Sequence, residues 1–434
     1  MSESHELNRQ IFRLAIPNII SNFSVPLLGA VDTALMGRLE TEHYLGAVGI
    51  GGAIFSFIYW GFGFLRMATT GMVAQSYGEE DHLECGFLLI RGLSLSFLIG
   101  LFLLCIQWLI IDISFYLMTT SAEVEQLGRV YFHIRIYAAP AVLCLHVFHG
   151  VFLGLQNAHY PMLLTITVNA INIILNILFV KVYGMKVEGV ALATVIAQYI
   201  GLLFAIILFI GKYPDLLKTW EVKEIFAFPK LNRFLSISND IFIRTLCLVF
   251  SNAYFTAKSA ALSDTFLAIN TILLQYINLM SYAIDGFAFA AESMIGKYKG
   301  AGDLRRIKDS IRHIFLFGFI FSGLFSLIFL LYDDKLLYLF TDKQELISQT
   351  KPYLIWIIIA PVINITAYIW DGIYLGATAS KSLRNSMFVA MVLFLCSIYV
   401  LSPYGNHGLW AALTILLIVR GVILSVMAPK SIFK

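Results

Sequence analysis

The chain has 434 residues, of which 59% are hydrophobic and 13% are charged, with a formal net charge of +3 and a mean hydropathy of +0.81. An ordinary soluble domain carries about 25% charged residues, so the composition excludes a soluble globular protein and indicates a polytopic all-α membrane protein. We expect no nucleic-acid partner, because the charge is small and its basic segments are explained by membrane topology.

The apolar stretches are numerous enough for about twelve membrane crossings of about 20 residues each. We predict helices over 11–36, 46–76, 86–111, 128–154, 161–181, 188–211, 231–257, 264–295, 311–331, 350–377, 385–401 and 408–427. The polar start MSESHELNRQ leads into a full-length span, whereas a cleavable signal has a short apolar core. The first helix is therefore expected to be retained.

Lysine and arginine are distributed unevenly over the predicted loops. With the N-terminus inside, the cytoplasmic segments hold about 18 of them and the opposite side about 8, in agreement with the positive-inside rule. The loops 211–233 and 297–312 supply most of this difference. We therefore predict that both termini are cytoplasmic.

Three blocks of sequence recur at an offset of about 222 residues. GVFLGLQNA (150–158) aligns with GIYLGATAS (372–380), GVALAT (189–194) with GLWAALT (408–414), and YGEED (77–81) with KGAGD (299–303). The repeat predicts two pseudo-symmetric lobes of six helices each, related by an axis along the membrane normal because six crossings return the chain to the same side. We expect an N-terminal lobe over 1–211, a cytoplasmic linker over 212–230 and a C-terminal lobe over 231–434.

The first predicted helix carries a single carboxylate, Asp32. An ionisable residue inside a membrane helix is costly and is by default a functional hypothesis. Helical spacing places Asp32 on one face with Asn22 and Asn18. Pro17 and Pro26 each lack an N–H and clash with the carbonyl four residues earlier, so they are candidate hinge points. The alternative is an acid that a neighbouring helix satisfies and that has no further role.

The helix over 161–181 presents three amides on one face, Asn169, Asn172 and Asn176, and the next helix carries Thr194. An unsatisfied polar group facing lipid costs several kcal/mol, so these amides must meet polar partners. Interhelical hydrogen bonding is one explanation. The presence of Asp32 in the same half favours a shared polar site instead.

The second half holds its own charged residues inside predicted helices. Asp240 and Arg244 stand four residues apart, and we expect them to neutralise each other. Asp285, Glu292 and Asp371 are further acids, and Asp285 and Asp371 are candidates to share Arg244. This polar network is either structural or functional, and the sequence leaves both readings open.

Several segments resemble the multidrug and toxic compound extrusion family, and within it the DinF-like branch. They are LAIPN (14–18), VDTALMG (31–37), FLRMATTGMVAQSYG (64–78), NDIFIRT (239–245), AIDGFAFAAE (283–292), WDGIYLGATASKSLRNSM (370–387) and GNHGLWAAL (405–413). The resemblance implies a V-shaped pair of six-helix lobes in a bacterial inner membrane, a monomer and not an enzyme. It also implies that small amphipathic, often cationic, compounds are exported against an inward flow of protons or sodium ions, with no cofactor.

The family's cation site has counterparts here. Asp32 matches the aspartate of its first helix, Thr194 the threonine of its sixth, and Asn172 and Asn176 the asparagine and aspartate of its fifth. Position 176 departs from the pattern because it is an amide. In the family pattern two neighbouring carboxylates can share a proton, whereas here Asp32 stands without a second acid. A sodium ion at this site would meet only one full negative charge, together with amide and hydroxyl oxygens. We therefore expect proton coupling and leave sodium open.

The resulting hypothesis is that protonation of Asp32 from outside lets the first helix bend at Pro17 or Pro26, so that the cavity of the N-terminal lobe shrinks and the substrate leaves. A lipid-linked precursor flippase of the same architecture is the first alternative, but it would need a cationic cleft. We count more acids in the predicted spans (Asp32, Asp285, Glu292, Asp371) than arginines (Arg66, Arg244). An intramembrane enzyme is less favoured because HExxH and GxSxG are absent. A channel would not need the repeat with its asymmetric polar sites.

Overall fold

The computed structural model describes residues 3–37, 41–118, 120–218, 222–339 and 341–433. These residues contain twelve helical segments that are long and apolar enough to cross a membrane. Each lies at one of the twelve predicted positions, from Ser4–Met36 to Ser402–Ser431. The largest differences are at the ends; for example, the seventh segment begins at Val222 instead of residue 231. The all-α membrane fold predicted from the sequence is confirmed.

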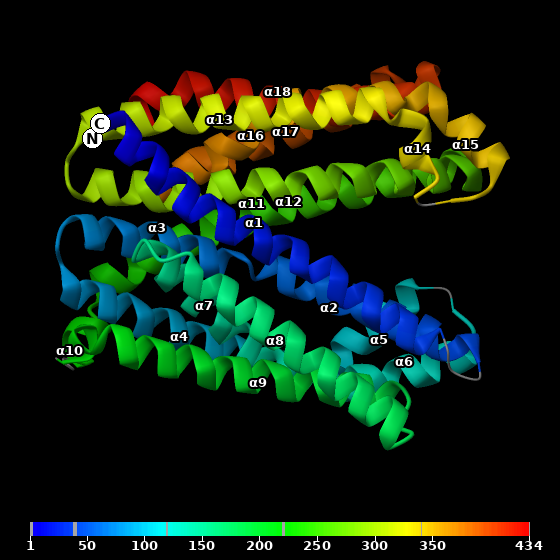
Figure 1. The fold of residues 1–434 in the computed structure, drawn as a ribbon, viewed down its shortest axis with the longest axis horizontal. Coiled ribbons are helices and arrows are strands. Elements are labelled where there is room, and N and C mark those ends of the chain that lie inside the picture. Colours follow the sequence, from blue (N-terminus) through cyan, green and yellow to red (C-terminus); the bar gives the residue numbers. More distant parts are fainter. Residues whose placement is uncertain (1–2, 38–40, 119, 219–221, 340, 434) are drawn as a thin grey trace. The chain divides into compact units, whose positions relative to one another are not determined.

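The chain forms two compact units, Ile20–Phe234, here called the N-unit, and Met1–Ile19 with Leu235–Lys434, here called the C-unit. Their elements are coloured along the chain in Figure 1. From Ile20 onward the N-unit holds the rest of α1 (Glu3–Met36), then α2 (Glu42–Gly61), α3 (Phe64–Gly78), α4 (His82–Cys105), α5 (Gln107–Leu117), α6 (Ala122–Arg135), η1 (Ile136–Ala138), α7 (Ala139–Gly154), α8 (His159–Ile177), η2 (Leu178–Val182), α9 (Val187–Lys212), η3 (Pro214–Leu217), α10 (Val222–Ile225) and the start of α11 (Phe228–Leu262).

The C-unit holds the start of α1, the rest of α11, α12 (Asp264–Gly300), α13 (Leu304–Leu331), α14 (Asp333–Leu337), α15 (Gln344–Thr350), η4 (Lys351–Tyr353), α16 (Leu354–Gly376), α17 (Ser380–Val400), η5 (Ser402–Tyr404) and α18 (Gly405–Ser431). Within this unit α1 begins and α18 ends at the same end of the helices (Figure 1). A chain that crosses a membrane an even number of times must begin and end on the same side, and this placement agrees with that.

The helix α1 runs without a break through both Pro17 and Pro26. It passes from the C-unit to the N-unit between Ile19 and Ile20, and this boundary lies between the two prolines. Its first part is held in the C-unit, where Phe12 packs against Phe317 with ring centroids 4.8 Å apart. The predicted lobes, 1–211 and 231–434, therefore differ from these units because the start of α1 belongs to the C-unit. Their role as separate bodies stays a prediction.

The segment predicted as a linker falls within the N-unit, and its described residues 222–230 contact α4. Arg91 of α4 is buried, and its guanidinium donates to the backbone carbonyls of Ile225 and, at 3.0 Å, of Glu224. Glu84, also on α4, forms ion pairs with Arg91 and, at 3.0 Å, with Lys230. A buried charge must be paired and hydrogen-bonded to be tolerated, so this cluster holds α10 firmly on α4.

The backbone conformation repeats between the two halves of the chain. Among the described residues the positive φ angles occur in pairs about 222 residues apart: Glu80 and Gly302 (60° and 71°), Gln156 and Thr378 (62° and 52°), and Gly184 and Gly405 (68° and 57°). Each pair lies at the same turn between helices. The N-caps of α4 and α13 repeat too, because Asp81 accepts from the Glu84 N–H and Asp303 from the Arg306 N–H, both at 2.9 Å. The predicted repeat is confirmed by this agreement.

Small residues let two helices approach closely at equivalent places in each unit. In the N-unit a Cβ at Gly150 of α7 would come within 2.6 Å of the Arg66 carbonyl oxygen on α3. In the C-unit a Cβ at Gly372 of α16 would overlap the Ala288 carbonyl oxygen on α12. Packing in lipid depends on such close approach, since lipid tails give helices no hydrophobic reason to associate.

We predict that Gly372→Ala lowers the unfolding free energy of the detergent-solubilised protein by about 1–3 kcal/mol, because the added methyl overpacks the α12–α16 contact. Gly323→Ala on α13 is the matched control, since nothing lies within 4 Å of a Cβ there. Thermal unfolding of the two variants measures the difference. Equal unfolding temperatures would contradict the proposed role of Gly372.

Candidate functional site

Asp32 lies in the last part of α1, within the N-unit, and is half-buried. The side-chain amide of Asn176, on α8, donates a hydrogen bond of 2.6 Å to Asp32 Oδ1. Asn176 is fully buried, so this bond places a neutral donor against the carboxylate where solvent does not compete.

A chain of hydrogen bonds continues from Asn176 to the next helix. Its amide also donates to Asn172 Oδ1 at 2.8 Å, the amide of Asn172 donates to Thr194 Oγ1 at 3.0 Å, and Thr194 donates to the Val190 carbonyl at 3.0 Å. The structure thus brings together Asp32, Asn172, Asn176 and Thr194, which the sequence singled out from three separate helices. Their role in ion coupling stays a prediction.

Asn169, one turn before Asn172 on α8, makes a second contact with α1. Its amide donates to Ser24 at the hydroxyl oxygen (3.0 Å) and at the carbonyl oxygen (3.3 Å). The amide face of α8 is therefore directed at α1 and α9, as expected for polar groups that must avoid lipid. Asn18, by contrast, bonds locally to the Leu14 carbonyl at 2.7 Å.

The end of α8 departs from regular geometry. A π-helical segment, Leu178–Val182, begins directly after Ile177 and therefore two residues after Asn176. Single π turns inside helices are rare and often occur at functional sites. The sequence reasoning missed this feature, since nothing in the run 177–182 (ILFVKV) distinguishes a π turn from an α turn.

Arg135 is a second residue of this site that the sequence reasoning missed. It ends α6 and is the charged side chain whose electrostatic field acts on Asp32. Its guanidinium donates to the Tyr131 hydroxyl at 2.5 Å and lies over the Phe55 ring, 4.9 Å from the centroid. The available signal was an arginine inside a predicted span, the same signal that drew attention to Arg66.

The count of charges in the spans was therefore wrong. The predicted spans also contain Arg91, Arg135 and Arg420, so the comparison of four acids with two arginines left out charged residues. The argument from this count against a cationic cleft does not stand. What the structure offers instead is pairing, because Arg91 is bonded to Glu84 and Arg420 to Asp371.

The C-unit has its own buried charge cluster around Asp371 of α16. Asp371 Oδ2 forms ion pairs with Arg244 of α11 and with Arg420 of α18, which the sequence analysis did not include. All three residues are buried. Asp285 and Glu292 of α12 add negative charge near Arg244. One carboxylate thus joins two helices to α16, with further acids beside them.

The expected pair of Asp240 and Arg244 is wrong. Asp240 accepts hydrogen bonds from Arg384 at 2.5 Å and from Ser380 at 2.8 Å, both on α17, while Arg244 is bonded to Asp371. Residues four apart on a helix lie close enough to pair. Here α17 offers partners to Asp240 and α16 offers one to Arg244, and these tertiary contacts replace the local pair.

No group of three or more His, Cys, Asp or Glu side chains that could hold a metal ion occurs among the described residues. The oxygens gathered in the N-unit come from one carboxylate, two amides and one hydroxyl. Asn176 Oδ1 is buried and has no hydrogen-bond partner among the residues that the structure describes. Asn176 Oδ1 can therefore accept a hydrogen bond from a donor close to Asp32.

A repeated bundle of twelve membrane-spanning segments, with a polar site inside one repeat, defines a polytopic membrane transporter. The comparisons agree. The family model MatE matches residues 17–178 and 241–402, so it matches once in each half, at nearly the offset found in the sequence. The chain belongs to the MatE family of transporters, and its members are not enzymes.

Individual relatives support this assignment. The chain is 35% identical over 425 residues to DNA damage-inducible protein F of Escherichia coli K12, which covers 96% of this chain and 91% of that protein. It is 23% identical to a probable multidrug resistance protein NorM of Thermotoga maritima, with 80% and 75% covered. A solved structure described as an outward-facing multidrug resistance MATE family transporter matches with a TM-score of 0.87 at 20% identity, covering 100% of this chain and 98% of that one.

We predict that Asp371→Asn lowers the unfolding free energy by about 3–5 kcal/mol, because it leaves two buried guanidiniums without their carboxylate. The matched control is Asp112→Asn, which removes a pair with Arg129 in which Asp112 is 65% exposed; such pairs contribute about 0–1 kcal/mol. Thermal unfolding in detergent compares the two. Similar losses for both variants would mean that the cluster does not hold α11, α16 and α18 together.

Proposed function

We propose that this chain is a proton-coupled antiporter that exports amphipathic, cationic organic compounds across a bacterial inner membrane. It works as a monomer with both termini in the cytoplasm, and Asp32 carries the proton. The observation that supports this most is the hydrogen-bonded chain from Asp32 through Asn176 and Asn172 to Thr194. It surrounds one titratable group with neutral partners that can serve both of its protonation states.

The amide of Asn176 suits a carboxyl that gains and loses a proton. With Asp32 charged, the N–H groups of Asn176 donate to Asp32 and to Asn172. With Asp32 protonated, its O–H needs an acceptor, and rotation of the Asn176 amide supplies Oδ1, which has no partner among the described residues.

Arg135 argues for a proton over a sodium ion. A sodium ion at Asp32 would lie near the guanidinium, and two cations in a membrane interior repel strongly. A proton on Asp32 adds no separate ion to the site, because it makes the carboxyl neutral. The single carboxylate and the neighbouring arginine therefore both disfavour sodium.

The same arginine links proton uptake to release of a cation. When Asp32 is charged, it balances Arg135 and the site has no net charge. When Asp32 is protonated, Arg135 is no longer balanced, and the site turns positive. A cationic compound bound nearby is then repelled, which gives the exchange of a proton for a cation that antiport needs.

Bending of α1 completes the proposed cycle. Pro17 and Pro26 lie on either side of the point at which α1 passes from the C-unit to the N-unit. Each proline leaves a carbonyl of the helix without its usual partner, which lowers the cost of a bend there. Loss of charge on Asp32 weakens its bond to α8, so the second part of α1 can move while the first stays on the C-unit.

We predict that purified wild type in proteoliposomes transports a fluorescent organic cation under an imposed pH gradient but not under a sodium gradient. Asp32→Asn abolishes this transport, because asparagine cannot take up the proton. Asp112→Asn is the control for reconstitution and retains activity. Transport that follows sodium alone would refute proton coupling. If neither gradient moves any cation, a flippase for lipid-linked precursors becomes the better reading.

Asn176→Asp should change the ion that drives transport. The variant places a second carboxylate beside Asp32, so two negative charges can hold a sodium ion despite Arg135. We expect transport to acquire sodium dependence, measured as uptake in a sodium gradient at equal pH on both sides. Asn169→Asp, one face position away and bonded to Ser24, is the matched control and should not acquire it. A sodium response in both variants would mean that added charge alone is the cause.

A further inference from the structure

Arg135 of α6 places its guanidinium among aromatic side chains of the N-unit. Its Cζ lies 4.9 Å from the centroid of the Phe55 ring and 5.5 Å from that of Tyr131, and its Nη1 donates to the Tyr131 hydroxyl at 2.5 Å. The ring of Tyr59, one turn after Phe55 on α2, is 5.6 Å from the Phe55 ring. Aromatic faces attract cations, and guanidiniums stack on them. Phe55, Tyr59 and Tyr131 are here called the aromatic cage.

A glycine of α2 makes room for this arrangement. A Cβ at Gly51 would overlap the Tyr131 ring, so this ring lies directly against the backbone of α2. Phe55 and Tyr131 are 0% and 2% exposed, whereas Arg135 and Tyr59 are partly exposed. The two rings in contact with the guanidinium are therefore covered, and Arg135 with Tyr59 forms the accessible edge of the cluster.

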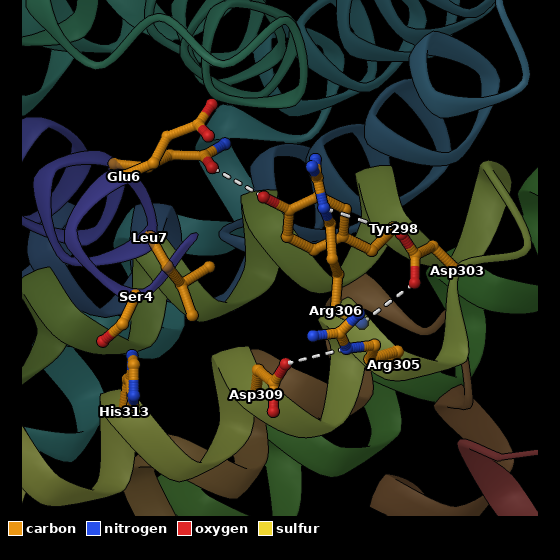
Figure 2. Close-up of a pocket in the computed structure, with 10 residues that line it drawn as sticks. Ser4, Glu6, Leu7, Tyr298, Asp303, Arg305, Arg306, Asp309 and His313 are labelled. Atoms are coloured by element: carbon orange, nitrogen blue, oxygen red, sulfur yellow. Dashed lines mark hydrogen bonds and ion pairs between the residues drawn. The ribbon is translucent and has the colours of Figure 1, made fainter. Parts of the chain in front are cut away.

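Other arginines of this chain are held by carboxylates. In the C-unit cavity of about 390 Å³ that Figure 2 shows, Arg306 lies 3.6 Å from Asp303. Arg135 makes no ion pair with a carboxylate in the described part of the chain, and its Nε is buried there without a hydrogen-bond partner. The aromatic cage is thus the main partner of the Arg135 guanidinium.

The hydroxyl of Tyr59 is a second unsatisfied polar atom of this cluster. It is buried and has no hydrogen-bond partner among the residues that the structure describes, and the charge of Arg135 acts on it. A phenolic hydroxyl can both donate and accept, and leaving it unpaired in a buried place is costly. A ligand with N–H donors can therefore gain a bond at Tyr59 that the Arg135 guanidinium does not make.

These features select the class of ligand. The ring faces favour a cation, and they favour a planar one that can stack. The hydroxyls of Tyr59 and Tyr131 favour a cation that carries N–H donors. A guanidinium or amidinium joined to an apolar body has all three properties. A quaternary ammonium lacks planarity and N–H donors, and a urea lacks the charge.

We propose that the aromatic cage binds the cationic group of an exported compound, that this group is a planar guanidinium or amidinium, and that Arg135 occupies the cage when no compound is bound. Since it takes the exported compounds to be cationic, this inference rests on the proposed function. Arg135 is then a tethered competitor, and a compound that enters the cage must displace it.

Asp32 gives the displaced guanidinium a second place. Asp32 and Arg135 act on each other electrostatically, so a charged Asp32 stabilises Arg135 away from the rings while the compound occupies them. Protonation of Asp32 removes this support. Arg135 then returns to the cage and displaces the bound compound, which is the order of events that exchange of a proton for a cation requires.

Calorimetric titration of the full-length protein in detergent, at one pH and without any gradient, tests the class of ligand. Three compounds with the same aryl body are compared: 2-phenylethylguanidinium, 2-phenylethyltrimethylammonium and 2-phenylethylurea. We expect the guanidinium to bind about tenfold more tightly than either of the others. Equal affinity of the urea would overturn recognition of a cation, and equal affinity of the trimethylammonium would overturn the planar class.

Variants of Arg135 test whether this side chain occupies the cage. Arg135→Ala opens the cage and should tighten binding of 2-phenylethylguanidinium about tenfold more than Arg135→Gln, which removes the same charge but keeps a long planar side chain. Equal tightening in both would mean that charge alone opposes the ligand. Arg129→Ala on the same helix is the control, because Arg129 lies 5.4 Å from the Phe115 ring but is ion-paired, and it should leave binding unchanged.

Variants of the rings locate the site. In the Arg135→Ala background, Phe55→Leu should weaken binding of 2-phenylethylguanidinium about tenfold, and Tyr59→Phe, which removes only a hydroxyl, should reduce its preference over the trimethylammonium compound. Phe115→Leu is the matched control and should change neither quantity. Unchanged binding in both cage variants would overturn the assignment. Unfolding temperatures identify a variant that fails to fold, and the other cage variant then decides.

These titrations are independent of the coupling ion, so the two inferences can fail separately. If transport in proteoliposomes follows sodium while the titrations give the expected order, proton coupling fails and the aromatic cage stands. If a pH gradient drives transport of an organic cation but the guanidinium compound binds no better than the urea, the aromatic cage is refuted and proton coupling stands.

Discussion

The hydrogen bond from Asn176 to Asp32 is the contact on which the arrangement of the N-unit depends. A carboxylate inside a membrane must be satisfied by the protein, since lipid supplies neither water nor donors. The donor comes from α8, and the rest of its amide face then finds partners on α1 and α9. This half-buried acid thus ties α1 to α8. The amide of Asn176 has both a donor and an acceptor, so it can bond to Asp32 in either protonation state.

Much of the fold could be read from the sequence because the membrane imposes simple rules. Hydropathy located all twelve segments, and the offset of GVFLG and GIYLG located the repeat, whose glycines do pack equivalent helices. Helical spacing brought Asn172 and Asn176 onto one face. Hydropathy and helical spacing are properties of the local sequence, and they are the same in the folded chain.

What the sequence could not supply was the choice of partner between distant helices. From the sequence, Asp371 could have paired with any of several arginines, and only the structure shows that it pairs with both Arg244 and Arg420. Arg135 acts on Asp32 from a helix about a hundred residues away, with no periodic relation to it. The π turn after Asn176 likewise has no signal in the sequence LFVKV that forms it. Pairings of this kind depend on tertiary geometry that spacing along one helix does not determine.

The central acids of the two units have different partners, and this difference bears on which acid can take part in a transport cycle. Asp371 is the ion-pair partner that two buried guanidiniums share, so neutralising it would take this partner from both at once, although Asp285 and Glu292 lie near Arg244. Asp32 is half-buried beside an amide that can turn from donor to acceptor, so neutralising it leaves one guanidinium, that of Arg135, unbalanced. Because a repeating cycle must charge and discharge its carrier at modest cost, we infer that the N-unit performs the coupling. The ion pairs of the C-unit join α11 and α18 to α16, which fits a structural role for that cluster.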